Sequence, residues 1–380
     1  RYRLMASEVP LTELIDLIDN EADMEILRQG ETRQRETWEG KEPDYLPILI
    51  NESVIDRKGL PSYDMREQFL DAEEMLYEQL WSALGAIRAK SDAIPSVRIN
   101  FGVGFLASIF GLTQQIFPDK MPWLKEHLRK QEISTIARES LDPIIEKGLL
   151  PRFRQYLETY REHLARKPVK VYLPDTQGPF DIAHLAMGDS IFSEFHRRPE
   201  LVLHLLSLTG YIYRETTSWL KSLIGEPLDG GYHSCNLVMS NCGARCCEDS
   251  TTLLSPELAG LAVPYLKEAV KPFSCWIHFC GNGLHIMKIY LELEEVKAVN
   301  LGNPEMYHWP AIMKGILDAQ KIYYGQVSRD DGETLSAYFR RVLSPLERKG
   351  NLIFQPILRE GEGAGEAIAI WHQLQDELFR

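Results

Sequence analysis

Residues 275–283 read CWIHFCGNG, and residues 284–294 continue as LHIMKIYLELE. The first stretch is an apolar run that ends on Gly-Asn-Gly, which is typical of a buried strand followed by a turn. The second stretch has apolar residues at helical spacing. Because alternate residues of a strand share one face, we expect His278 and Cys280 to point in the same direction at the end of this strand.

The same strand-then-helix unit recurs along the chain. Two early strands are predicted at 46–50 and 93–100, and six more follow at 169–180, 230–239, 273–283, 296–305, 321–328 and 351–358. Eight strands alternating with helices predict an α/β fold of the (β/α)8 TIM-barrel type. An open doubly wound sheet is the alternative, but we find no Gly-x-Gly-x-x-Gly after a strand. We therefore predict a single domain over 1–380, with an N-terminal helical extension over 1–40.

The composition restricts the kinds of partner. The formal net charge is -13, which argues against broad binding to nucleic acid or to an anionic membrane. The sequence has no apolar run of the length that a membrane span needs, and its acidic, amphipathic start is unlike a signal peptide. All six cysteines lie between residues 235 and 280, which is unlike a disulfide framework. A reduced, cytoplasmic protein is the simplest interpretation.

Polar residues gather where the predicted strands end. In a (β/α)8 barrel the reacting groups lie on the loops that follow the C-terminal ends of the strands. Loops are polar in general, so an ordinary loop role is the alternative for each of these residues. The positions concerned are Asp175, Gln177, Gly178, the stretch 241–249, the stretch 278–282, the stretch 300–303, Gln326 and Gln355.

Several motifs, taken together in order, resemble the uroporphyrinogen decarboxylase-like superfamily. Each motif alone has low specificity, but their order and spacing along most of the chain are more specific. They are WEGKEPDYLPI (38–48), GPFDIAHLAMG (178–188), HRRPELVLHLL (196–206), CCEDSTTLLSPELAGLAVPYLKEAV (246–270) and HFCGN (278–282). The resemblance implies a (β/α)8 barrel, which agrees with the strand count.

The resemblance also separates two chemistries within that superfamily. True uroporphyrinogen decarboxylases carry an arginine-rich segment after the first strand, and the corresponding residues 51–69, NESVIDRKGLPSYDMREQF, lack it. The chain is therefore more similar to the cobalamin-dependent methyltransferases. That branch implies methyl transfer between a corrinoid, carried by a partner protein, and a thiol or other small acceptor.

Zinc is the cofactor that this branch implies. Its members bind the ion through His-x-Cys, here His278 and Cys280, and through a cysteine on a later strand. The last predicted strand, NLIFQPIL, has no cysteine. A third ligand is therefore expected from the preceding strand end, where Glu248 is preferred over Cys246 and Cys247. The alternative for the His-x-Cys pair is ordinary core packing, with a hydrogen-bonded histidine and a buried thiol.

Further candidates are polar side chains at or near the predicted strand ends. An acidic group can act as an acid or anchor a ligand, an arginine can bind a carboxylate or phosphate, and amides suit neutral groups. A turn-capping or packing role is the alternative for each of them. We expect Asp92, Arg98, Asp175 and Gln177 as catalytic groups, and Asn100, Asn300 and Asn303 as substrate-binding groups.

Three functions remain open from the sequence. The first is the zinc-assisted methyltransferase. The second is a metal-free decarboxylase or lyase that acts on a small carboxylated substrate through Arg98 and Asp92. The third is a barrel that binds a ligand without catalysis. The expected partners are a small-molecule substrate, a corrinoid protein and, in a homodimer, a second copy of the chain.

Overall fold

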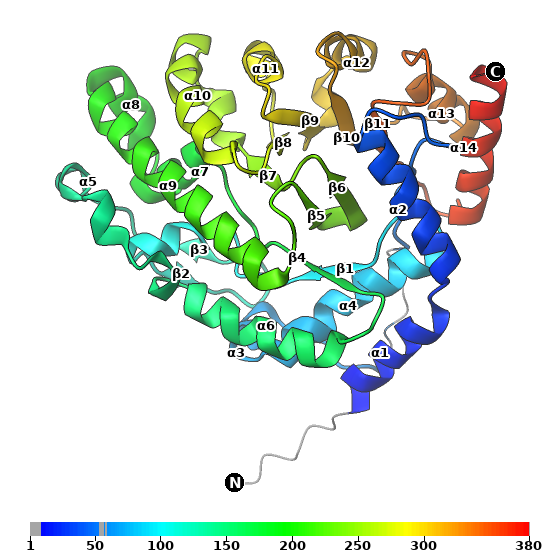
Figure 1. Ribbon diagram of the computed structural model, residues 1–380, viewed down its shortest axis with the longest axis horizontal. Helices are drawn as coiled ribbons and strands as arrows, with labels where there is room; N and C mark the ends of the chain where they lie inside the picture. The colour runs from blue at the N-terminus through cyan, green and yellow to red at the C-terminus, as the bar shows by residue number, and fades with distance from the viewer. Residues whose placement is uncertain (1–8, 53–56, 58, 380) are drawn as a thin grey trace.

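The computed structural model describes residues 9–52, 57 and 59–379 (Figure 1). It is a mixed α/β structure in which the helices surround the strands. The helices are α1 (Val9–Glu21), α2 (Met24–Trp38), α3 (Met65–Leu70), α4 (Ala72–Ala89), α5 (Lys130–Thr135), α6 (Leu150–Leu164), α7 (Pro179–Met187), α8 (Ser190–Arg197), α9 (Pro199–Ile224), α10 (Pro256–Val270), α11 (Leu284–Leu291), α12 (Trp309–Asp318), α13 (Leu335–Leu343) and α14 (Ala364–Leu378). The strands are β1 (Ser96–Arg98), β2 (Gln114–Gln115), β3 (Trp123–Leu124), β4 (Lys170–Tyr172), β5 (Gly230–His233), β6 (Leu237–Ser240), β7 (Ala244–Cys247), β8 (Cys275–Phe279), β9 (Val296–Leu301), β10 (Ile322–Gln326) and β11 (Leu352–Gln355).

Parallel pairing organises the strands. A five-stranded sheet has the order β11-β10-β9-β8-β7, and β1 pairs with β4 in a separate parallel ladder. Isolated parallel bridges link Gln177 to Cys247 and Ile48 to Phe354, so the segment after β4 lies beside β7 and the segment 46–50 lies beside β11. Asp92 donates its backbone N–H to the Ile48 carbonyl at 3.0 Å, which brings the segment before β1 to 46–50.

Capping residues mark the points where the helices begin and end. The Ser255 side chain accepts the Leu258 N–H at the start of α10, and Pro256 occupies the first turn, where a missing N–H costs nothing. Helix α9 ends at Gly225, whose φ of 87° places it in the left-handed region that glycine tolerates. Within the predicted helical extension the described residues form two helices, α1 and α2, because Asp23 caps a new start and accepts from the N–H groups of Glu25 and Ile26.

One predicted strand is wrong. Residues 230–239 form an antiparallel hairpin, β5 and β6, joined by a turn at Ser234–Asn236. Asn236 has a φ of 67° in that turn, a value that asparagine adopts more readily than most residues. The parallel strand at this place in the chain is β7, which the sequence analysis had assigned to the following loop.

The hairpin fills space among the parallel strands, near the centre of Figure 1. Leu237 and Met239 belong to one buried apolar cluster with Trp276 of β8 and Tyr324 of β10. The apolar residues 237–239 of this hairpin resemble a parallel strand buried on both faces, which explains the incorrect prediction, although His233, Ser234 and Asn236 interrupt the segment before them.

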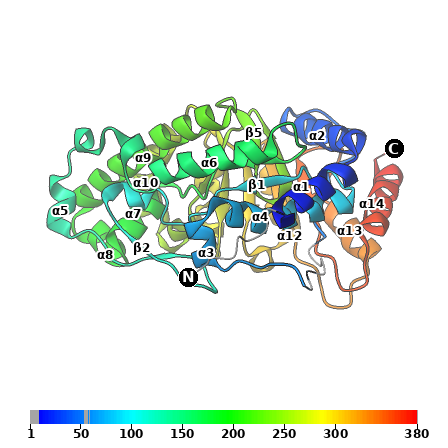
Figure 2. The ribbon, with the colours of Figure 1, turned by 90° about the horizontal axis from the view of Figure 1, so that it is seen from below.

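Helix α2 covers the hairpin from outside. The Trp38 indole N–H donates to the Val238 carbonyl at 2.6 Å, and the Gln34 amide donates to the Asp92 carbonyl at 2.7 Å. The N-terminal helices therefore form part of the packed structure, and Figure 2 shows α1 and α2 against its body. Among the helices in the described part of the chain, none combines the length and the apolar character that crossing a bilayer requires.

Candidate functional site

His278, near the end of β8, is held in one tautomer by its neighbours. The Asn300 amide donates through Nδ2 to the Tyr324 carbonyl at 2.6 Å, so Asn300 Oδ1 faces the ring. His278 Nδ1 lies 2.5 Å from that oxygen and must carry the proton. Burial, assisted by the positive charge of Arg245, lowers the pKa of His278, so the ring is neutral at pH 7. Its other nitrogen, Nε2, therefore keeps a free lone pair.

That lone pair faces groups that can bind a cation. His278 Nε2 lies 3.2 Å from Cys280 Sγ and 3.7 Å from Asp249 Oδ1. Cys247, the register partner of His278 on β7, completes a group in which ligand atoms of Cys247, Asp249 and His278 all lie within 4.8 Å of one another. One nitrogen, one carboxylate oxygen and two sulfurs are donors of the kinds that zinc accepts.

The Cys280 thiol needs a cation to ionise here. Burial raises the pKa of Cys280 to about 11, and the nearby Asp249 carboxylate adds to the shift. Asp249 also accepts the Cys280 backbone N–H at 2.5 Å, which fixes the carboxylate beside the thiol. A bound cation would reverse this balance, because it stabilises the thiolate and neutralises Asp249.

Glu248 lies apart from this group. Its Oε1 accepts the Phe180 backbone N–H at 3.3 Å and lies 3.9 Å from Cys246 Sγ, and the side chain is buried against Gly178. Residues 246 and 248 share the face of the β7 segment opposite to that of Cys247. The carboxylate that the structure brings to His278 is that of Asp249.

Asp175 and Gln177 lie on the other side of the group and form a charge network. Asp175 Oδ1 accepts from Arg245 Nη1 at 2.7 Å and from Gln177 Nε2 at 2.7 Å. Arg98, at the end of β1, has its Nη1 3.9 Å from Asp175 Oδ2. Burial would raise the pKa of Asp175, but the two guanidinium groups more than offset it and lower the pKa. Asp175 is therefore a carboxylate at neutral pH.

Asp92 is placed away from the C-terminal ends of the strands. It precedes β1, and its carboxylate bonds Arg33 Nη1 and the Ile48 N–H, each at 2.9 Å. These contacts tie α2 to the segment 46–50. They give Asp92 a structural role, at the end of the strand opposite to the His278 group.

The three asparagines that were expected to bind substrate have different roles in the structure. Asn300 is part of the His278 group. Asn303 Oδ1 accepts the Gly281 N–H at 2.8 Å and so holds the loops after β8 and β9 together. Asn100 Oδ1 accepts the Gly102 N–H at 3.3 Å, which is a turn contact.

Sequence reasoning missed Arg245, Asp249 and Asp181 as site residues, and it preferred Glu248 to Cys246 and Cys247 as the third ligand. Arg245 shares the alternate-residue face of Cys247 in β7, whereas Asp249 follows the strand as the first residue of the 3-10 helix Asp249–Leu253. Asp181, in the first turn of α7, accepts the Asp249 N–H at 3.0 Å and the Ser250 N–H at 2.8 Å, and so orients the loop that carries Asp249. Burial and the Asp249 charge raise the pKa of Asp181 to about 7.

Two cavities flank these residues. One, of about 470 Å³, is lined by Gln177, Asp249 and α7 residues with Trp123 of β3 across it; we call it the Asp249 cavity. The other, of about 630 Å³, is lined by Arg98, by the last residues of β10 and β11 and by the residues that follow β11; we call it the Arg98 cavity. Ligand sites of small-molecule enzymes commonly have such volumes.

Comparisons with known proteins agree with this architecture. No family model and no curated sequence matches the chain. Among solved structures, a methyltransferase from Methanosarcina mazei matches with a TM-score of 0.63 and 13% sequence identity, over 92% of this chain and 98% of that chain. At this identity the likeness establishes a shared fold, and it extends over nearly the whole length of both chains.

Proposed function

We propose that this chain is a methyltransferase of the uroporphyrinogen decarboxylase-like superfamily, with its catalytic centre at His278. The observation that carries the proposal is the fixed tautomer of His278, which directs a free Nε2 lone pair at Cys280 and Asp249. The fold shared with a methyltransferase supports it, as do the motifs that resemble that superfamily.

The proposed architecture is a closed (β/α)8 barrel. Eight parallel segments support it: 46–50, β1, β4, β7, β8, β9, β10 and β11. Ladders or bridges join seven neighbouring pairs, and the contacts of Asp92 with Ile48 join the remaining one. The His278 group then lies at the C-terminal face of the barrel, where enzymes of this fold place their chemistry.

The proposed metal is zinc, bound by His278, Cys280 and Asp249. Asn300 supports the site from behind, since a hydrogen bond to the second ring nitrogen of a ligating histidine fixes its orientation. Zinc bound there would hold an incoming thiol as its thiolate at neutral pH. Cys247 is the further donor if the ion takes four protein ligands.

The chain's own residues position the reactants. His278 stays neutral and keeps its proton on Nδ1, while Asp181 fixes the loop of Asp249. The thiolate lone pair forms the new sulfur–methyl bond, and the electrons of the broken bond remain with the methyl donor. The two cavities provide room for two ligands, as group transfer requires. We further propose that the donor is a corrinoid on a partner protein, and that the enzyme is cytoplasmic and forms a homodimer.

Metal analysis of protein purified without chelator tests this function. We expect zinc near stoichiometry in the wild type and in Glu248→Gln, and loss of zinc in His278→Ala, Cys280→Ala and Asp249→Ala. Methyl transfer from methylcobalamin to 2-mercaptoethanol should follow the metal content. Metal-free protein with full transfer activity, or zinc loss in Glu248→Gln but not in Asp249→Ala, would contradict the proposal.

A metal-free lyase is the second candidate function. The position of Arg98 beside a cavity favours it, because a guanidinium can hold a substrate carboxylate. Asp92, the other residue assigned to that chemistry, is engaged with Arg33 and Ile48 instead. Decarboxylation that resists chelators and disappears in Arg98→Ala would favour the lyase over the methyltransferase.

A further inference from the structure

The Arg98 cavity has an unusual charge for this chain. Besides Arg98 and Tyr172, its walls carry the amides of Asn51, Asn236, Gln326 and Gln355. Among the described residues that line it, there is no aspartate, glutamate, lysine or histidine. In a chain with a net charge of -13, the single charged group of this cavity is therefore a cation.

The charge of Arg98 is only partly neutralised by Asp175. Asp175 Oδ1 accepts from Arg245 and Gln177 at 2.7 Å each, whereas Arg98 Nη1 lies 3.9 Å from the other oxygen. Asp175 thus makes its short contact with Arg245, which also interacts with the Asp249 carboxylate, and the contact of Asp175 with Arg98 is long. Arg98 is 21% exposed at its side chain and borders the cavity, so its guanidinium is available to a ligand.

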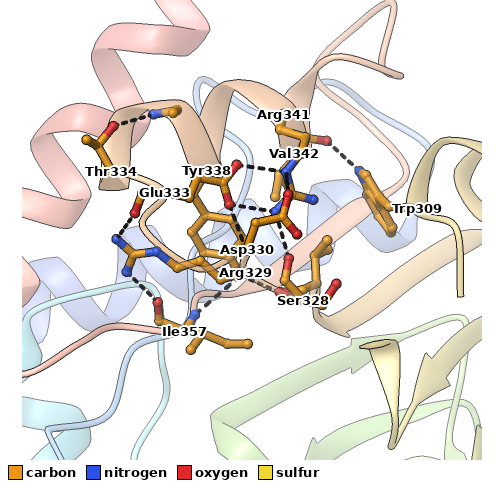
Figure 3. Close-up of polar contacts among 12 residues, drawn as sticks. Trp309, Ser328, Arg329, Asp330, Glu333, Thr334, Tyr338, Arg341, Val342 and Ile357 are labelled. Atoms are coloured by element: carbon orange, nitrogen blue, oxygen red, sulfur yellow. Dashed lines mark hydrogen bonds and ion pairs between the residues drawn. The ribbon is translucent and has the colours of Figure 1, made fainter. Parts of the chain in front are cut away.

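The cavity wall is held in place from behind. Figure 3 shows the network around Arg329, in the loop after β10. Arg329 donates to the carbonyl of Ile357, a wall residue, at 3.0 Å and pairs with Glu362 at 2.6 Å. The Tyr338 hydroxyl accepts the Ile357 N–H at 3.4 Å. Because both polar groups of the Ile357 backbone are bonded, the wall is ordered before a ligand enters, which reduces the entropy lost on binding.

We propose that the Arg98 cavity binds a small molecule that has one carboxylate and a neutral hydrogen-bonding body. The carboxylate pairs with the Arg98 guanidinium, which has the planar donor geometry for it. The Asn51 and Asn236 amides already bond each other, Ser82 and Ile94, so the exposed Gln326 carboxamide supplies the donor and the acceptor for amide or hydroxyl groups in the rest of the molecule. That this ligand is a substrate of the enzyme rests on the proposed function. The binding of the ligand to the Arg98 cavity does not.

The test uses N-acetylglycine, which has one carboxylate and one amide, and its neutral counterpart N-acetylglycinamide. Dissociation constants would be measured by ligand-observed NMR on the full chain. We expect N-acetylglycine to bind at least about tenfold more tightly than the neutral amide, because a charge-assisted hydrogen bond is lost in the latter. Inorganic phosphate is the third probe, and competition by phosphate at similar affinity would show that the cavity accepts any anion and would overturn the carboxylate assignment.

Variants test whether the ligand binds at Arg98. Arg98→Gln should lose the preference for the acid, Arg98→Lys should retain part of it, and Arg340→Gln, on the exposed face of α13, should bind as the wild type does. His278→Ala should also bind normally, which separates this proposal from the fate of the proposed methyl transfer. Equal binding of acid and amide by the wild type, undetectable binding of the acid, or an unchanged preference in Arg98→Gln would each overturn the proposal. Circular dichroism and thermal unfolding would confirm that each variant is folded.

Discussion

Replacement of Asn300 by leucine tests the argument for the metal site most directly. Leucine has the branched shape of asparagine with a somewhat larger volume, and it lacks the oxygen that accepts the His278 Nδ1 proton at 2.5 Å. The proposed zinc ligands themselves remain in the chain. A loss of affinity would therefore come from the orientation and tautomer of the imidazole, and not from a missing donor atom.

The structure sets the size of the expected effect. In the variant the Nδ1–H group of His278 is buried without its partner, which lowers the free energy of unfolding by about 1–3 kcal/mol. The ring can then take the other tautomer, which places the proton on Nε2 and removes the lone pair from the metal. Loss of such supporting partners typically weakens metal binding about 10–100-fold. We expect a zinc dissociation constant that is higher by about this factor in Asn300→Leu.

Competition with a chromophoric chelator would measure the affinity, and the absorption of the cobalt-substituted protein would report the ligand set. Asn282→Ala is the matched control, since Asn282 lies two residues from Cys280 and bonds only the Leu284 N–H among the described contacts. Asn300→Asp, which keeps an oxygen for Nδ1, should retain more affinity than Asn300→Leu. Wild-type affinity in Asn300→Leu would refute the argument that the Asn300 contact prepares His278 for a metal.

Three other outcomes are expected. Gly302→Ala would place a Cβ 2.7 Å from Cys280 Sγ, so zinc content should fall while the melting temperature changes little. Lys221→Met leaves the buried Glu226 carboxylate without the ammonium that lies 3.1 Å away, and denaturant unfolding should show a loss of about 3–5 kcal/mol. Burial lowers the pKa of His372 from 6.5 to about 4, so its stabilising contribution is complete above pH 6.5 and declines as the pH falls toward 4. The free energy of unfolding should decrease from pH 7 to pH 5, and a His372→Gln variant should show a smaller decrease.

Most of the parallel strands were predictable from a run rich in apolar residues that ends at a turn. Strands β1, β4, β8, β9, β10 and β11 all lie within the predicted ranges, although β1 and β4 have only three residues each. The hairpin of residues 230–240 was not predictable in the same way. Its apolar side chains are buried among other strands, and burial on both faces removes the alternation that distinguishes an antiparallel ribbon from a parallel strand.

The carboxylate assigned to the metal was not predictable from strand periodicity either. With the strand placed at 230–239, residues 241–249 became a loop, and a loop gives no rule for the direction of its side chains. Strand β7 ends at Cys247, so strand alternation places Arg245 and Cys247 on one face but does not extend to Asp249, which begins the 3-10 helix Asp249–Leu253. The preference for Glu248 rested on the family resemblance, which implies an acidic residue near this place, and the structure brings the neighbouring Asp249 to His278 instead. The turn between β7 and the 3-10 helix decides which carboxylate reaches His278, and a pattern of four strand residues does not predict the geometry of that turn.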